Sequence, residues 1–268
     1  MSVIRSVALN VFRESVRDKV LYNLVFFAVL LIAASYLLSQ LTAGQDVKII
    51  KDLGLAASSL FGLFIAVFIG IGLVWKEVER RSIYSLLSKP LRRRDFVLGK
   101  YLGLVFTLLV NLAIMAAALY LVLAYYDWTS PESLSRTWEA PAVDPALLEA
   151  FALIFVELML VTAIALFFST FSSPLLSAAL TFGLFIIGHF NADLKHFESV
   201  VASPVAAWVA RALYYLLPNL APFDIKSQVV HGQPVAAGYL LLTSAYGFVY
   251  IAALLVAAAA VFSRRDFK

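Results

Sequence analysis

The sequence contains no cysteine and little charge. None of the 268 residues is Cys, 14% are Asp, Glu, Lys or Arg, and 62% are hydrophobic. Without Cys, a disulfide framework, a thiol nucleophile and a thiolate metal site are all excluded. A soluble domain usually has about 25% charged and about 45–50% apolar residues. The composition therefore indicates an integral membrane protein, with one membrane domain and no sizeable soluble domain.

Motifs for nucleotide binding and hydrolysis are also missing. A Walker A loop needs a Gly, four residues, and then Gly-Lys followed by Ser or Thr. Here Gly99-Lys100 is followed by Tyr101, and Arg94 stands where the first Gly should be. Neither a G-x-S-x-G elbow nor an H-E-x-x-H zinc helix occurs. We therefore expect no enzymatic activity and no cofactor in this chain, and its net charge of +4 does not indicate nucleic-acid binding.

Two arrangements of titratable residues deserve comparison with known sites. His189, Asn191 and Asp193 stand close together and could bind a metal, but a polar helix end explains them better, and we expect no metal site. Glu77 and Glu79 could suggest an intramembrane protease that uses paired glutamates. They are not adjacent, they flank the membrane surface, and no His stands within a span near them.

Long apolar runs predict six membrane spans, because about 20 apolar residues cross a bilayer core. The first run begins near Val20 and is too long for a signal peptide, so we expect it to be retained. From 158 to 192 there is no charge for 35 residues, and Ser172-Ser173-Pro174 divides this stretch into two helices. The fold class is therefore an all-α membrane protein, with predicted spans at about 21–42, 53–75, 101–125, 146–171, 174–190 and 236–262.

Shorter helices are expected around these spans. Residues 1–19 predict a cytoplasmic amphipathic helix in the headgroup layer, the alternative being an ordinary solvated helix. Residues 20–262 would form the six-span domain and 263–268 a cytoplasmic tail. A helix over 204–217 would be about 21 Å long, which is too short to cross, so we expect outer interfacial or re-entrant pieces before the sixth span.

The distribution of Lys and Arg predicts the orientation. Six spans place both termini on one side. With that side inside, fifteen of the 21 Lys and Arg residues lie on it, in the N-terminal segment, in 76–100 and in the tail. The positive-inside rule then predicts a multi-pass protein of the cytoplasmic (inner) membrane with both termini in the cytoplasm. No internal repeat is evident, which disfavours a secondary transporter built from inverted repeats.

Most of the charge lies between spans two and three, in the segment 75–103. Its first part mixes charges with an apolar ridge that suits a docking helix, formed by Val78, Ile83, Leu86 and Leu87. Its second part places three arginines beside the inner leaflet, whose anionic lipids attract each basic residue by about 1 kcal/mol: Arg92, Arg93 and Arg94. The alternative is that these charges only fix the orientation in the membrane.

Glu157 is the one acid within a predicted span. An acid at the centre of a membrane helix costs about 2.5–3.5 kcal/mol on insertion scales and usually faces a bundle interior or a wet cavity. We predict either a functional polar site or a structural hydrogen bond to another helix, with Asn111 of the third span as the candidate partner.

Several short motifs together resemble one family. They are Glu77 and Glu79 with Arg80 and Arg81, Ser82-Ile83-Tyr84, Leu86-Leu87-Ser88-Lys89-Pro90, Arg93, Phe96, Leu98-Gly99-Lys100, a Tyr214-to-Phe223 segment before the last span, and the Arg264-Arg265-Asp266 tail. The sequence resembles permease subunits of type-2 ATP-binding cassette (ABC-2 type) exporters along its whole length. Ser82 stands where the family commonly has Thr.

The resemblance implies a half-transporter with a cytoplasmic coupling helix between spans two and three. Two permeases, identical or different, would pair with two separate ATPase subunits that bind ATP and Mg²⁺. The coupling interface would comprise Glu77, Glu79, Arg80, Arg81, Ile83, Tyr84, Leu86 and Leu87. The resemblance also implies a substrate path along spans one, two and five. Phe61, Phe64 and Phe68 would suit an amphipathic or lipid-like substrate, but ordinary lipid-facing residues explain them equally well.

The sequence thus predicts an exporter permease, with membrane lipids as its surroundings. Two alternatives stay open: a membrane anchor or assembly factor without a transport path, and a secondary transporter without an ATPase partner.

Overall fold

The computed structural model describes residues 3–41, 45–79, 93–131, 138, 140–190, 208, 214 and 217–264. Within these ranges every element is helical and no strand occurs. The elements are α1 (Val3–Val16), α2 (Lys19–Ser39), α3 (Asp46–Glu79), α5 (Arg93–Thr129), α7 (Ala146–Ser169), α8 (Pro174–His189), the 3₁₀ helix η1 (Ala221–Phe223), α11 (Lys226–Val230) and α12 (Ala237–Arg264). The all-α class predicted for this chain is confirmed.

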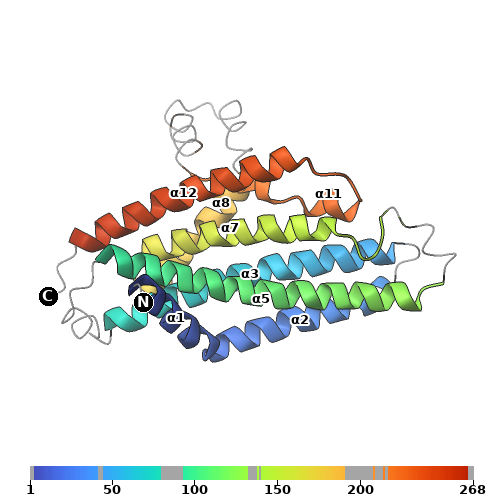
Figure 1. Cartoon of the computed structure of the whole chain (residues 1–268), viewed down its shortest axis with the longest axis horizontal. Helices are drawn as coiled ribbons and strands as arrows, with labels where there is room; N and C mark the ends of the chain where they lie inside the picture. The colour runs from blue at the N-terminus through green and yellow to red at the C-terminus, as the bar shows by residue number, and fades with distance from the viewer. Residues whose placement is uncertain are drawn as a thin grey trace.

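The long helices form one elongated bundle (Figure 1). Five of them, α2, α3, α5, α7 and α12, are long and apolar enough to cross a membrane. The sixth apolar helix, α8, has 16 residues and a length of about 24 Å, short of a hydrocarbon core of about 30 Å. The six-span layout therefore stays a prediction.

Several helices extend past the apolar runs that mark them in the sequence. α3 begins at Asp46, before the expected 53, and α5 covers Arg93–Thr129 rather than 101–125. A helix does not need to end where the hydrocarbon ends, so its charged first and last turns escape a hydropathy criterion. α2 begins one residue after Asp18, whose carboxylate accepts a hydrogen bond from Val20 N at 2.9 Å as an N-cap.

α3 and α7 form the centre of the bundle. Most residues of the apolar stretch of each helix are buried, whereas α2 and α12 are largely exposed. Leucine side chains of the neighbouring helices lie directly over two glycines of α3. An added Cβ at Gly54 would collide with Leu119 of α5, and one at Gly62 would collide with Leu158 of α7. The centre is therefore packed at the distance that small residues allow.

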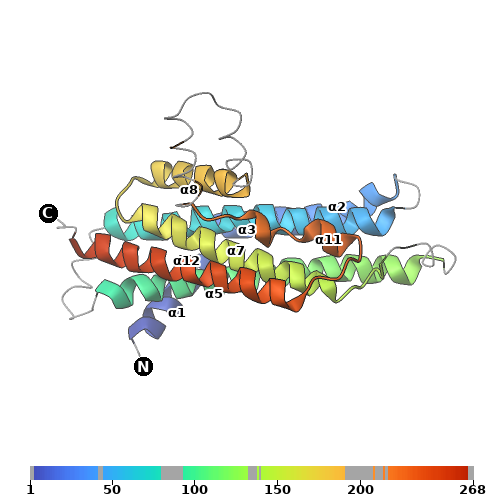
Figure 2. The same ribbon diagram turned by 90° about the horizontal axis from the view of Figure 1, so that it is seen from above.

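The helix ends gather at two opposite ends of the bundle. α1, the last turn of α3, the first turn of α5 and the end of α12 lie at one end, and the start of α7 and α11 lie towards the other (Figure 2). The end of α3 and the start of α5, which flank the basic segment, thus lie beside α1 and the end of α12. This placement agrees with a location of the basic segment and α1 on one side of the membrane, which stays a prediction.

The chain enters the bundle again before α12. Leu220, Phe223 and Ile225 are buried around η1, and α11 packs on α3 and α7. The backbone N–H of Leu220 donates to the carbonyl of Gly188, in the last turn of α8, at 2.9 Å. The helix expected over 204–217 lies, apart from single residues, outside the described part of the chain.

Candidate functional site

The helices that carry the predicted coupling segment end on either side of it. Glu77 and Glu79 lie in the last turn of α3, and Arg93 opens α5, but the side chains of these three are not described. Arg94 is exposed in the first turn of α5. The remaining predicted residues lie outside the described residues: Arg80, Arg81, Ile83, Tyr84, Leu86, Leu87 and Arg92. The coupling interface itself stays a prediction.

α1 crosses the first turns of α5, directly after the coupling segment, in close contact. A methyl group on Gly99 would lie 2.7 Å from the Cβ of Val7, and one on Gly103 would lie 2.6 Å from the carbonyl oxygen of Ala8. Both distances are impossible for a real Cβ, so α1 can lie here only because both residues are Gly. Gly99 and Gly103 are four residues apart and therefore share one face of α5, as in the G-x-x-x-G motif of membrane helix pairs.

α1 has the two faces that its sequence pattern predicts. Its polar residues Ser6, Asn10 and Arg13 are exposed, while Val11 is buried against α5. One turn further along the contact, the rings of Phe12 and Phe106 lie 4.5 Å apart. The apolar face of α1 is thus used on α5, and its cationic face remains open to the surroundings.

α12 also contacts the first turns of α5. Phe262 stacks on Phe96 with 5.9 Å between ring centroids, and the Lys100 Nζ atom lies 5.0 Å from the Phe96 centroid. α1, α5 and α12 therefore form a cluster at the end of the basic segment. A displacement of the start of α5 would act on both of its neighbours.

A buried polar contact lies at the middle of α7. Glu157 is only 2% exposed, and its Oε1 atom lies 3.2 Å from the Nε2 atom of His189 at the end of α8. Asn111, the partner that we considered from the sequence, donates its side-chain amide to the carbonyl of Thr107 at 2.6 Å. In the described structure the partner of Glu157 is thus His189 rather than Asn111.

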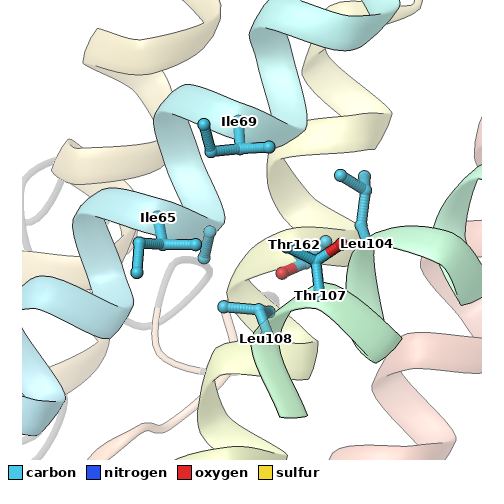
Figure 3. Close-up of a pocket in the computed structure, with 7 residues that line it drawn as sticks. Ile65, Ile69, Leu104, Thr107, Leu108 and Thr162 are labelled. Carbon is cyan, nitrogen blue, oxygen red and sulfur yellow. The ribbon is translucent and has the colours of Figure 1, made fainter. Parts of the chain in front are cut away.

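The contact between α3, α5 and α7 near this depth contains a small apolar void (Figure 3). Its lining is Ile65, Ala66, Ile69, Leu104, Thr107, Leu108 and Thr162, and it is too small to admit a water molecule. The hydroxyls of Thr107 and Thr162 donate to carbonyls of their own helices. This void is therefore a packing defect between helices rather than a binding site.

Phenylalanines connect α3 with α8. Phe64 and Phe68 each contact Phe182 of α8, with 6.0 and 5.9 Å between ring centroids, and Phe61 lies 6.2 Å from Phe64. Phe68 is 48% exposed. The three phenylalanines singled out in the sequence thus belong to one aromatic row shared by two helices.

The cluster His189, Asn191 and Asp193 is only partly described. In the ranges that the structure describes, no three His, Cys, Asp or Glu residues gather in a way that could hold a metal ion. Asn191 and Asp193 lie outside those ranges.

Comparison with known families decides the affiliation of the chain. The family model described as "ABC-2 family transporter protein" matches residues 5–267. The chain belongs to the ABC-2 transporter family. A search of curated proteins found no match.

Membership of the ABC-2 family confirms the resemblance identified from the motifs. The match extends over α1, the basic segment and all the described helices, so the chain is a membrane transport component of this family and not itself a catalyst. Sequence reasoning missed two features of the family member at hand: the pair of Glu157 with His189, and the seat of α1 on Gly99 and Gly103. The second could have been found, because the four-residue spacing of two glycines is visible in the sequence.

Proposed function

We propose that this ABC-2 family protein is the permease subunit of an exporter, which provides the substrate path and is driven by a separate ATPase subunit on the cytoplasmic side. The observation that carries the proposal is the family match over residues 5–267. ATP and Mg²⁺ would bind to the partner subunit, and a second permease subunit, identical or different, would complete the transporter.

The contacts around α5 support a route for the coupling. The segment 77–87 would dock on the ATPase, and the docked segment continues directly into α3 on one side and towards α5 on the other. α5 in turn is in close contact with α1 through Gly99 and Gly103 and with α12 through Phe96. Movement of the docked segment would therefore shift α1, α5 and α12 together, while Arg92, Arg93 and Arg94 would hold the segment to the anionic inner leaflet.

The aromatic row between α3 and α8 supports the proposed path. Spans one, two and five correspond to α2, α3 and α8, and Phe64, Phe68 and Phe182 bring two of these helices together with an apolar, partly exposed surface. Such a surface suits an amphipathic or lipid-like substrate.

Purification of the chain from its native membrane tests the assignment most directly. We expect an ATPase subunit to co-purify in mild detergent, and the Glu77→Ala and Glu79→Lys variants to recover less of it. Glu149→Ala is the matched control, since Glu149 stands in the first turn of α7, away from the coupling segment.

The outcome separates the proposal from its alternatives. If the chain were a membrane anchor or a secondary transporter, no ATPase would co-purify with it. Equal recovery of the ATPase with all three variants would contradict the role of 77–87.

A further inference from the structure

The contact between Glu157 and His189 has a chemical requirement of its own. The Nδ1 atom of His189 lies 3.1 Å from the carbonyl oxygen of Phe185, one turn earlier in α8. A carbonyl oxygen can only accept a hydrogen bond, so Nδ1 carries a proton. In a neutral ring the proton on Nδ1 leaves Nε2 with a lone pair, and the Nε2 atom lies 3.2 Å from the Oε1 atom of Glu157, without the alignment of a hydrogen bond.

Two lone pairs at this distance repel each other unless a proton lies between them. A carboxylate and a neutral Nε2 atom offer none. With one added proton the contact becomes favourable, either as an imidazolium that donates to a carboxylate or as a carboxylic acid that donates to a neutral ring. Both forms contain the same number of protons and have no net charge. The contact is therefore favourable only with one more proton than the separated carboxylate and neutral imidazole contain.

The surroundings make this proton necessary rather than optional. Glu157 lies at the middle of α7, and the residues before and after it in the sequence are buried. Its Oε1 atom has no aligned hydrogen bond within the described residues. A bare carboxylate there is costly. His189 ends α8, where the partial negative charge of the helix terminus favours a cation. Its side chain is 25% exposed, whereas that of Glu157 is 2% exposed.

The other titratable groups near the pair do not replace this proton. Lys226 and Asp224, at the start of α11, both act on Glu157, but with opposite sign, and they pair with each other at 3.7 Å. α5 and α12 bring phenols near α7: Tyr101, which donates to the carbonyl of Met159, and Tyr246 with its neighbour Tyr250. Lys100, also buried on α5, lies over the ring of Phe96. The ionisable residues that precede the apolar stretch of α3 lie in its first two turns, where Lys51 contacts Pro141 and Asp144 before the start of α7.

We propose that Glu157 and His189 form a proton-binding site inside the helix bundle, which fastens the end of α8 to α7 when one proton is bound and releases it when the proton leaves. The released part would be the end of α8, because α8 ends at His189. The other contact at this end is the hydrogen bond from Leu220 N to the carbonyl of Gly188, which joins α8 to the segment before η1. The closed contact binds more protons than the open one, so raising the pH favours the open state. The ligand is a proton alone, and the site does not depend on coupling to an ATPase.

The distance between α7 and α8 tests the proposal on the isolated full chain in lipid nanodiscs. Because the chain has no Cys, Leu148→Cys and Ile186→Cys place two spin labels at unique positions on exposed side chains of the two helices. The distance between the two spin labels is measured by double electron–electron resonance at about pH 5 and about pH 8, on either side of the range in which an ordinary histidine changes its charge. We expect one narrow distance population at the lower pH and a second, longer one at the higher pH.

Two substitutions of Glu157 separate a proton site from a merely structural contact. In Glu157→Gln the amide N–H can donate to the neutral Nε2 atom and the amide oxygen can accept from the imidazolium, so the single narrow population should persist at both pH values. In Glu157→Leu neither is possible, and the longer population should be present at both. His231→Gln is the matched control, because His231 makes the same contact to a carbonyl one turn earlier, to Ser227 at 2.8 Å, and is exposed; it should behave like the parent.

Two results would overturn the proposal. One is a parent distance distribution that is the same at both pH values. The other is a pH response in Glu157→Gln as large as that of the parent, which would assign the response to other groups even if Glu157→Leu failed to fold.

Discussion

Lys51 is a lysine without exposed surface in the second turn of α3. Its Nζ atom donates to the carbonyl of Pro141 at 2.8 Å and lies 3.8 Å from the Oδ2 atom of Asp144. Asp144 also accepts from the backbone N–H of Ala146, at the start of α7, at 2.9 Å. Lys51 therefore connects the beginning of α3 with the segment that leads into α7.

This arrangement predicts unequal effects for its two partners. Asp144→Asn would leave a buried ammonium with only neutral acceptors, and we expect it to cost about 1–3 kcal/mol of stability. Lys51→Met removes the charge and retains most of the packing stem, so it should cost less. Thermal unfolding in detergent measures both. In the Lys51→Met background Asp144→Asn should cost less than alone; fully additive effects would contradict the pairing.

At this scale the sequence indicates which residues are unusual better than which residues they meet. Glu157 stands out because a charge in an apolar run is visible at once. Its partner does not, because the position of His189 depends on where α8 ends and on how α8 packs against α7. Asn111 was a reasonable candidate from its place in a neighbouring span, but its amide is satisfied within its own helix.

α1 is the element whose placement is set by the smallest side chains. Its contact with α5 depends on Gly99 and Gly103. Gly99 stands in the motif Leu98-Gly99-Lys100 that resembles the family, and Gly103 follows three residues after it. The motif therefore has a structural explanation in addition to any role in docking: it forms a seat for the N-terminal helix directly after the basic segment.

Filling this seat should displace α1. Gly103→Leu would push a side chain into the Val11 side chain and the Ala8 carbonyl, and we expect a loss of about 1–3 kcal/mol, measured as a lower unfolding temperature in detergent. Gly183→Leu in α8 is the matched control, because a Cβ at Gly183 meets nothing within 4 Å. A similar loss for both variants would show that the effect is general to glycine in these helices and not due to α1.

The positions of the long helices could be predicted because each span needs a long apolar run, which the sequence shows directly. Their ends could not, since α3 and α5 continue through charged turns at Asp46 and Arg93. The burial of η1 and α11 was also not predictable, because a short apolar helix has the same sequence pattern whether it lies at the membrane surface or inside the bundle.

At the scale of the whole molecule, the helices that flank the basic segment end beside α1 and the end of α12. The family match covers this entire arrangement. The predicted coupling residues between Glu77 and Leu87 were inferred from motifs and charge, and their role rests on that inference, since most of them lie outside the described residues.

The rate of ATP hydrolysis by the purified ATPase subunit, with and without this chain in nanodiscs, tests the central claim most directly. We expect the rate to change when the parent chain or the control Glu149→Lys is added, and to remain that of the ATPase alone when Glu79→Lys is added. A rate that does not respond to the parent chain, or that responds equally to Glu79→Lys, would contradict the assignment of this protein as a permease coupled through the segment between α3 and α5.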